Sequence, residues 1–134
     1  MIYLFVYGTL LKKAGNMMAT FLSEKSIYMG EGEMAGMLYK VDFFPGAIHD
    51  PAAESTVKGE LYELHDAQKV LEVLDTYEGF NPEDVSNSLF VRKEVDIESE
   101  GQLWNAWVYL YNMPVNSHEL IPSGDFLKYD VERY

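Results

Sequence analysis

Hydrophobic and polar residues alternate with a period of two over much of the chain, which is typical of half-buried β-strands. The first apolar run, Tyr3–Tyr7, is too short for a helix and ends at Gly8. It predicts a buried strand followed by a sharp turn or a close backbone approach. Further strands are predicted at 26–41, 57–64, 89–97 and 104–111. The glycines within residues 26–41 indicate bulges or bends, and the last strand, which is apolar on both faces, is expected to be central.

Two segments carry the helical period instead. The first covers about Met17–Ser23, with Asn16 as its predicted N-cap. The second covers about Ala67–Tyr77, with Asp66 as its predicted N-cap. Gly79 follows at the position where a left-handed residue usually ends a helix. The apolar face of the second helix consists of residues about one turn apart: Val70, Leu71, Leu74 and Tyr77.

The turns are marked by proline, glycine and short polar runs. In Phe43–Ala47, Pro45 followed by Gly46 favours a type II turn. The tail from Asn112 is predicted to be loop-like, with a turn of helix near Phe126–Tyr129. Further loops or turns are expected at 50–55, 81–88 and 98–101, the last closing a hairpin.

Five or six strands, two helices and short connections predict an α+β fold with a small, mainly antiparallel, strongly curved sheet. The pattern does not decide whether this sheet closes into a barrel. The chain contains no repeat, linker or low-complexity tract. We therefore expect a single domain over residues 1–134.

Composition narrows the classes of function. The absence of cysteine excludes disulfides, thiolate metal sites and a cysteine nucleophile. A formal net charge of −12 opposes nucleic-acid binding. No apolar run is long enough for a signal sequence or a membrane span, so we expect a soluble, cytoplasmic protein. An anionic ligand would have to be held by backbone amides and a few cations, such as Lys12, Lys13 or Arg92.

Several common catalytic patterns are missing. No serine lies in a G-x-S-x-G motif, no glycine run matches the dinucleotide-binding pattern, and the three histidines are scattered. We therefore expect neither a metal, nor another cofactor, nor a catalytic triad. The sequence carries no signal for an oligomeric state.

Glu78 is the titratable residue that the pattern singles out. It lies at the C-terminal end of the second helix, where the helix dipole disfavours a carboxylate by ~0.3–1 kcal/mol. Asp75 adds a like charge on nearly the same face, and Tyr77 and Phe80 could exclude water. All three effects are expected to raise the pKa of Glu78 toward neutrality, the range useful for proton transfer.

Short motifs in a fixed order along nearly the whole chain resemble those of the gamma-glutamylcyclotransferase-like family, which includes gamma-glutamylamine cyclotransferase-like proteins. The first is the loop Tyr7-Gly8-Thr9-Leu10, at the end of the first strand. Phe90 is a departure, since members of the family often have a tyrosine there. The other motifs are Phe44-Pro45-Gly46-Ala47, Val57–Tyr62, Leu74–Phe80, Arg92–Val95, Ala106–Tyr109 and Pro122–Asp125.

The resemblance implies a β-barrel-like α+β fold and an enzyme that cyclises a small γ-glutamyl amide to 5-oxoproline with release of an amine. It places the catalytic glutamate at Glu78, as general acid and base, opposite backbone amides of the first loop. The residues that it implies for substrate binding are Tyr7, Gly8, Thr9, Leu10, Phe44, Pro45, Gly46 and Tyr109.

Two alternatives stay open at this point. The same site could belong to a gamma-glutamylamine cyclotransferase acting on γ-glutamyl-lysine or polyamine compounds. It could also belong to a non-catalytic module that binds a small metabolite. The sequence does not identify the leaving amine.

Overall fold

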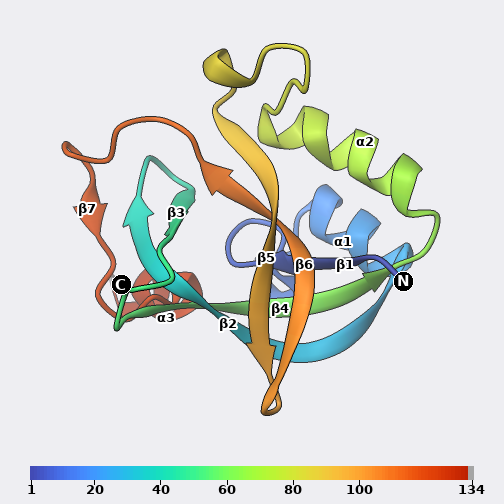
Figure 1. Ribbon diagram of the computed structural model, residues 1–134, viewed down its shortest axis with the longest axis horizontal. Helices are drawn as coiled ribbons and strands as arrows, with labels where there is room; N and C mark the ends of the chain where they lie inside the picture. Colours follow the sequence, from blue (N-terminus) through green and yellow to red (C-terminus); the bar gives the residue numbers. More distant parts are fainter. Residues whose placement is uncertain (133–134) are drawn as a thin grey trace.

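The computed structural model describes the backbone of residues 1–132, and the side chains of that range other than residue 13 and residues 130–132 (Figure 1). The helices are α1 (Met17–Glu24), α2 (Ala67–Glu78) and α3 (Phe126–Glu132), with 3₁₀ turns at Lys12–Ala14 and Val85–Asn87. None of the helices described has both the length and the apolar character needed to cross a membrane. The strands are β1 (Tyr3–Val6), β2 (Ser26–Lys40), β3 (Pro45–His49), β4 (Thr56–Leu64), β5 (Phe90–Ser99), β6 (Gln102–Tyr111) and β7 (Glu119–Leu120).

Five strands close into a small barrel. Their hydrogen-bonded order is β2-β4-β1-β6-β5, and β5 pairs again with β2 through Glu33 and Glu98. Only β1 and β6 run parallel; the other pairs in the described chain are antiparallel. A register shift between Tyr28 and Gly30 bends the long strand β2. The predicted α+β fold with a strongly curved, mainly antiparallel sheet is confirmed, as is the barrel-like closure implied by the family resemblance.

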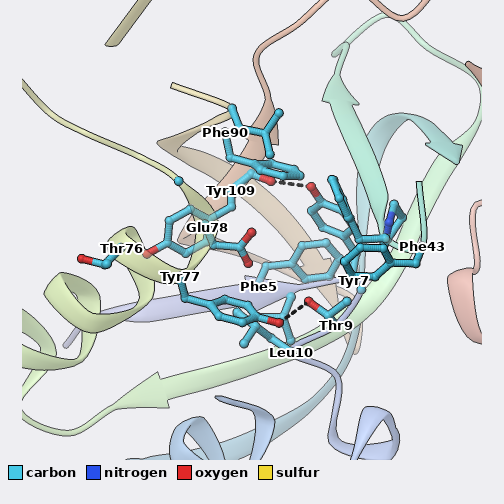
Figure 2. A pocket seen from close by; sticks show the side chains of 16 residues that line it. Phe5, Tyr7, Thr9, Leu10, Phe43, Thr76, Tyr77, Glu78, Phe90 and Tyr109 are labelled. Atoms are coloured by element: carbon cyan, nitrogen blue, oxygen red, sulfur yellow. Dashed lines mark hydrogen bonds between the residues drawn. The ribbon is translucent and has the colours of Figure 1, made fainter. Parts of the chain in front are cut away.

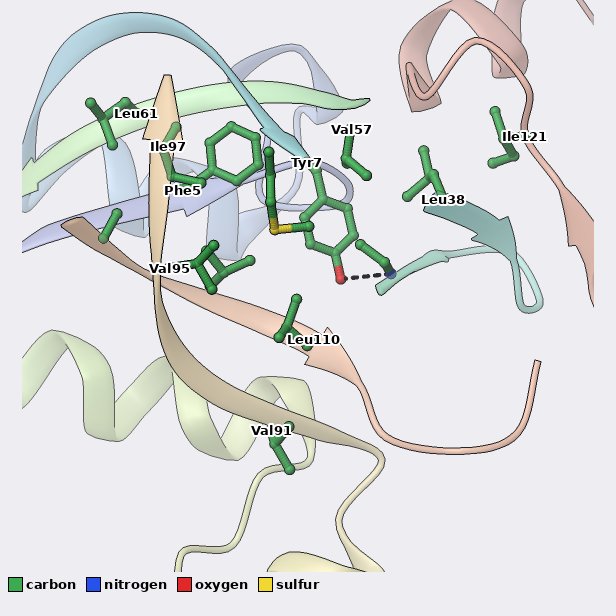
Figure 3. Packing of buried hydrophobic residues seen from close by; sticks show 14 residues of the cluster. Phe5, Tyr7, Leu38, Val57, Leu61, Val91, Val95, Ile97, Leu110 and Ile121 are labelled. Carbon is green, nitrogen blue, oxygen red and sulfur yellow. Dashed lines mark hydrogen bonds between the residues drawn. The ribbon is translucent and has the colours of Figure 1, made fainter. Parts of the chain in front are cut away.

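The apolar residues of β1 belong to both hydrophobic clusters found in the described part of the chain. Phe5 points into the barrel, where it packs with residues such as Met34, Leu61 and Ile97 (Figure 3). Leu4 and Val6 belong to a second cluster between the sheet and the helices α1 and α2, which lie on one side of the barrel in Figure 1. Because β1 is covered on both faces, its period-two pattern appears as an uninterrupted apolar run.

The predicted type II turn at Phe43–Ala47 is wrong. The turn lies earlier in the chain, at residues 41–44, where the amides of Val41 and Asp42 both donate to the carbonyl of Phe44. Pro45 is instead the first residue of β3, paired with Lys40. Proline is tolerated there because β3 is at the edge of the sheet and its first residue need not donate to the ladder.

The predicted helix ends are correct at two of three positions. Asn16 caps α1 by accepting a hydrogen bond from the amide of Ala19 at 2.8 Å, and Gly79 ends α2 with a left-handed φ of 72°. Asp66 is not a capping side chain, because its own backbone is left-handed (φ 52°) and its carboxylate accepts no cap hydrogen bond. In the tail, β7 was not predicted.

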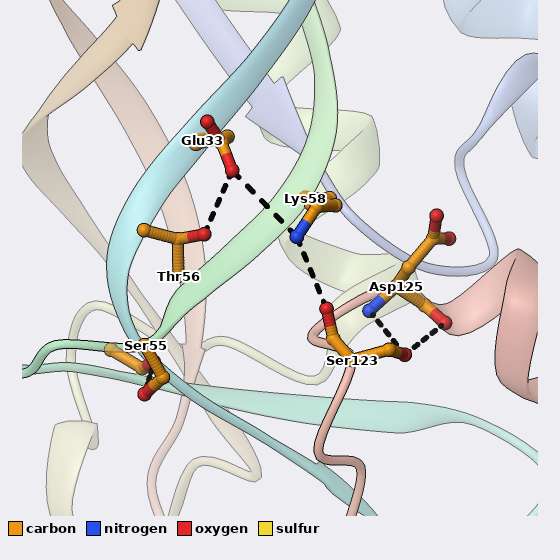
Figure 4. A network of polar contacts seen from close by, with 7 residues as sticks. Glu33, Ser55, Thr56, Lys58, Ser123 and Asp125 are labelled. Carbon is orange, nitrogen blue, oxygen red and sulfur yellow. Dashed lines mark hydrogen bonds and ion pairs between the residues drawn. The ribbon is translucent and has the colours of Figure 1, made fainter.

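The tail is attached to the barrel by a polar network around Lys58 (Figure 4). The Lys58 ammonium donates to the carbonyl of Ser123 at 3.2 Å and lies 3.7 Å from the carboxylate of Glu33. The Lys58 amide donates to the carbonyl of Gly124. Thr56 Oγ1 also donates to Glu33, so strands β2 and β4 and the segment before α3 are joined at one place.

We expect Ile97→Ala to lower the free energy of unfolding by ~2–5 kcal/mol, because it empties space inside a closed barrel that collapses poorly. Ile97 has no exposed surface. Urea denaturation followed by circular dichroism measures this change. The matched control is Leu103→Ala on the neighbouring strand β6, where the side chain is 70% exposed. The control should stay within ~0.5 kcal/mol of the wild type; an equal loss in both variants would contradict the position of the core.

Candidate functional site

A cavity of about 280 Å³ opens where β1 ends (Figure 2). Its walls come from the loop after β1, the turn before β3, the last turn of α2 and the start of β5. This volume is just below the ~300–1,000 Å³ typical of drug-sized ligands, so the site suits a small molecule. The lining residues are Phe5, Val6, Tyr7, Gly8, Thr9, Leu10, Phe43, Phe44, Pro45, Thr76, Tyr77, Glu78, Gly79, Leu89, Phe90 and Tyr109.

The loop after β1 is shaped by the contact of Gly8 with Pro45. A Cβ atom on residue 8 would lie 2.6 Å from Pro45 Cγ, so only glycine fits without displacement. The turn is closed by a hydrogen bond from the Leu11 amide to the Gly8 carbonyl at 3.0 Å. Asn16 fixes it further by donating from Nδ2 to the Thr9 carbonyl.

The main-chain amides of this loop have unused donor capacity. Within the described chain, those of Gly8, Thr9 and Leu10 donate to no protein acceptor. All three residues line the cavity. A group of backbone amides without protein acceptors suits an anion or a developing oxyanion.

Glu78 is the last residue of α2, and its side chain points into the space bounded by Tyr77, Tyr109 and Phe5 (Figure 2). Its carboxylate makes no hydrogen bond or ion pair with any other residue that the structure describes. Burial raises the pKa of Glu78 from 4.5 to about 7. A carboxyl group with this pKa both accepts and releases a proton near neutral pH.

The predicted contribution of Asp75 to the raised pKa of Glu78 is wrong, because burial causes the shift and Asp75 adds nothing to it. Asp75 lies in a different environment, one helical turn earlier. Arg92 donates to both of its carboxylate oxygens, from Nε at 2.8 Å and from a terminal nitrogen at 3.1 Å. The effect of the helix dipole on Glu78 stays a prediction.

Asp75, Arg92 and Tyr109 form a cluster that we call the clamp. The Tyr109 hydroxyl donates to Asp75 Oδ1 at 2.7 Å, and the Arg92 guanidinium lies 4.3 Å from the centre of the Trp107 ring. Burial, followed by the hydrogen bond to Asp75, raises the pKa of Tyr109, so its hydroxyl stays protonated. The clamp fastens the last turn of α2 to strands β5 and β6, and thereby fixes the place from which Glu78 projects.

Two further tyrosines join the walls of the cavity. The Tyr7 hydroxyl donates to the carbonyl of Tyr109 at 2.5 Å and accepts a hydrogen bond from the amide of Ala47 at 3.2 Å. Burial and then the charge of Glu78 raise the pKa of Tyr7, which keeps this hydroxyl neutral. The Tyr77 hydroxyl donates to Thr9 Oγ1 at 3.0 Å, so the end of α2 is tied directly to the first loop.

The cavity brings together all the candidate residues except Gly46. A Cβ atom on Gly46 would lie 2.8 Å from Tyr111 Cβ, so this glycine allows β3 to pack against β6 and does not line the cavity. Sequence reasoning missed several lining residues. Two of them could have been found from their place in the sequence, because Phe43 precedes Phe44 and Thr76 is two residues before Glu78. For Phe5, Val6 and Leu89 the sequence offered no signal beyond strand propensity.

The cations considered for an anionic ligand are placed elsewhere. Arg92 is paired with Asp75, and the Lys12 ammonium lies 5.8 Å from the centre of the Tyr28 ring. The side chain of Lys13 lies outside the described part of the chain. Among the described residues, no side chain that lines the cavity is positively charged, and no cluster of acidic or histidine side chains is arranged to hold a metal ion.

Comparison with known proteins gives consistent results. Residues 4–128 match the protein family described as Gamma-glutamyl cyclotransferase, AIG2-like. The chain is 30% identical over 134 residues to the gamma-glutamylcyclotransferase family protein YtfP of Escherichia coli (strain K12), covering 95% of this chain and 97% of that protein. It is 32% identical over 111 residues to the gamma-L-glutamyl-butirosin B gamma-glutamyl cyclotransferase of Niallia circulans, covering 81% of this chain and 66% of that enzyme.

The fold is similar to the crystal structure of YkqA from Bacillus subtilis. The TM-score is 0.75 at 22% sequence identity, and the match covers 98% of this chain. This chain spans 42% of the YkqA chain. At this identity the likeness concerns the fold alone.

The raised pKa of Glu78 makes stability depend on pH. Because the folded-state pKa exceeds the unfolded value of 4.5, the native state gains stability below pH 4.5 and loses it as the pH rises through about 7. At about 1.4 kcal/mol per pKa unit, the wild type should lose ~3 kcal/mol relative to Glu78→Gln between pH 4 and pH 8. Urea denaturation of both proteins across this range measures the difference. Parallel pH dependences of the two proteins would contradict a raised pKa.

The clamp is expected to be stabilising only as a complete unit. Asp75→Asn should lower the free energy of unfolding by ~2–4 kcal/mol, because it leaves the Arg92 guanidinium partly buried without a counter-charge. The double variant Asp75→Asn/Arg92→Met should recover part of this loss. Thermal and urea denaturation of the two single variants and the double variant test the coupling; additive losses would show that Asp75 and Arg92 act independently.

Proposed function

The chain belongs to the gamma-glutamyl cyclotransferase, AIG2-like family, and from this premise we propose that it cyclises a small γ-glutamyl amide to 5-oxoproline and releases the amine. The observation that carries the proposal is Glu78, an unpaired carboxyl group with a pKa of about 7. It shares a small cavity with backbone amides that have no acceptor within the described part of the protein. The family supports an enzyme of the gamma-glutamylcyclotransferase type; the reaction and the roles of the residues are our proposal.

In the proposed reaction the substrate supplies its own nucleophile. The α-amine of the γ-glutamyl group attacks the γ-carbonyl carbon, and a five-membered ring forms. Intramolecular attack in a well-oriented geometry reaches effective molarities of ~10⁵–10⁸ M. The enzyme therefore needs to fold the substrate, move protons and stabilise the oxyanion, and these tasks require no side-chain nucleophile.

Glu78 is the proposed proton carrier. In its ionised form it takes a proton from the attacking amine, and as the carboxylic acid it gives a proton to the departing nitrogen when the amide C–N bond breaks. A pKa of about 7 allows both transfers at neutral pH. No described residue forms an ion pair with Glu78, which supports this role because a carboxylate held in an ion pair would be a poor base.

The loop after β1 is the proposed oxyanion site. As the tetrahedral intermediate forms, its negative oxygen would accept hydrogen bonds from amides of Gly8, Thr9 and Leu10, which have no acceptor within the described protein. The same amides suit the α-carboxylate of the glutamyl group. Tyr7, Phe44, Pro45 and Tyr109, which line the cavity, would hold the substrate in its folded conformation.

We expect Glu78→Gln to reduce 5-oxoproline release at least ~100-fold, because general acid–base catalysis contributes ~10²–10⁴-fold. In the wild type, kcat/KM should rise with pH through an apparent pKa of about 7, since the ionised carboxylate is the base. The measurement is chromatographic detection of 5-oxoproline with γ-glutamyl amides that differ in the leaving amine.

Glu72→Gln is the matched control, since Glu72 is exposed on the same helix and lies outside the cavity. Circular dichroism should show the same fold for both variants. Turnover by Glu78→Gln at the wild-type rate would exclude Glu78 as the proton carrier. Binding of 5-oxoproline without turnover of any γ-glutamyl compound would favour a metabolite-binding module instead.

A further inference from the structure

The proposed site has two parts that come from different elements and are anchored separately. The loop after β1 is held by the contact of Gly8 with Pro45. It is also held by the hydrogen bond from Asn16 to the Thr9 carbonyl. The end of α2 is held by the clamp, which attaches it to β5 and β6. Neither of these anchors joins the loop to the helix, so the separation between the loop amides and Glu78 depends on a further contact.

One hydrogen bond crosses from the helix to the loop. The Tyr77 hydroxyl donates to Thr9 Oγ1 at 3.0 Å (Figure 2). In the part of the chain that the structure describes, no other hydrogen bond joins α2 to residues 8–11. Tyr77 directly precedes Glu78, and both side chains line the cavity. The Tyr77 side chain therefore extends along the cavity wall from the residue beside the proton carrier to the loop that carries the amides.

Two of the three polar groups of Thr9 are engaged in a way that holds the third. The carbonyl accepts a hydrogen bond from Asn16 Nδ2 at 2.6 Å, and the hydroxyl oxygen accepts one from Tyr77. The amide has no acceptor in the described part of the protein. With the carbonyl and the side chain both held, rotation of the Thr9 backbone is restricted. A donor whose direction is fixed in advance stabilises an oxyanion without reorganising during the reaction.

The same hydrogen bond keeps the Tyr77 ring against the cavity. The ring is 43% exposed, so packing covers only part of it and the hydroxyl secures its far end. Burial causes the raised pKa of Glu78, and Tyr77 belongs to the wall that provides this burial. Without the hydrogen bond the ring is free to turn into solvent. Water would then reach Glu78 and lower its pKa.

We propose that Tyr77 is a positioning residue of the site: through its hydrogen bond to Thr9 it holds the loop amides opposite Glu78 and closes the cavity wall beside that carboxyl group. This inference rests on the proposed function and adds to it a residue that acts through Thr9. Intramolecular attack depends strongly on geometry, so the rate should fall when the two parts of the site are free to move apart. Because the hydrogen bond is partly exposed, its net strength is modest, and the loss should be several-fold.

The first test removes only the hydroxyl of Tyr77. At pH 8, Tyr77→Phe should lower kcat for 5-oxoproline release by ~3- to 10-fold. KM should stay within ~2-fold of the wild-type value, because the lost stabilisation belongs to the transition state. The apparent pKa in the pH dependence of kcat/KM should move to lower pH, since water reaches Glu78. A wild-type kcat, or a lowered kcat with an unchanged pH dependence, would overturn the inference.

Tyr28→Phe is the matched control. Tyr28 is 45% exposed, close to the value for Tyr77, and it does not line the cavity. The control should keep the kcat and the pH dependence of the wild type. Equal changes in Tyr28→Phe and Tyr77→Phe would show a general effect of losing a surface hydroxyl and would overturn the specific role of Tyr77.

A double-mutant cycle tests whether Tyr77 acts through Thr9. Thr9→Val removes the accepting hydroxyl with little change in side-chain size. If the two side chains act as a unit, the double variant Tyr77→Phe/Thr9→Val should be no slower than the slower single variant. Thr9→Ser keeps a hydroxyl and should be at least ~2-fold faster than Thr9→Val. Losses that multiply in the double variant would overturn the link between the two residues.

The outcomes separate this inference from the proposed function. An active wild type with an unaffected Tyr77→Phe variant would refute the positioning role alone and leave the proposed function standing. A wild type that releases no 5-oxoproline from any γ-glutamyl amide would refute the proposed function and the positioning role with it.

Discussion

The site depends on the contact of one buried carboxylate with groups from two strands. Asp75 accepts two hydrogen bonds from Arg92 and one from Tyr109. Each of these three groups would be costly to leave without its partners. Because the three come from α2, β5 and β6, the helix cannot slide or rotate on the barrel without breaking the clamp.

Asp75 and Glu78, both at the C-terminal end of α2, therefore lie in opposite electrostatic environments. Asp75 is buried with its charge balanced, and it serves as an anchor. Glu78 is three residues later, so the helix carries it round to the cavity, where burial is not compensated by a partner and the pKa rises to about 7. The fixed position of the first acid allows the second to be held in an environment that destabilises its charge. The contacts of Asp75 with Arg92 and Tyr109 offset the folding stability that is lost by burying Glu78.

The sequence contained the local features of this arrangement but not the long-range ones. The apolar run of β1, the cap at Asn16 and the left-handed Gly79 follow from side-chain pattern and backbone freedom, and these predictions are confirmed. The strand that begins at Pro45 was missed because turn propensity outweighed its edge position, which is a property of the whole sheet. Asp75 was read as a repulsive neighbour of Glu78, since nothing local reveals that Arg92, 17 residues later, neutralises it.

The parallel pairing of β1 with β6 makes the barrel depend on contacts between distant parts of the chain. The neighbours of β1 in the sheet are residues 56–64 and 102–111. The strand that leads into the loop amides is apolar on both faces, and these faces are covered only when strands distant in sequence reach it. Because pairing of sequence-distant strands is slow, closure of the barrel is expected to be a late step in folding.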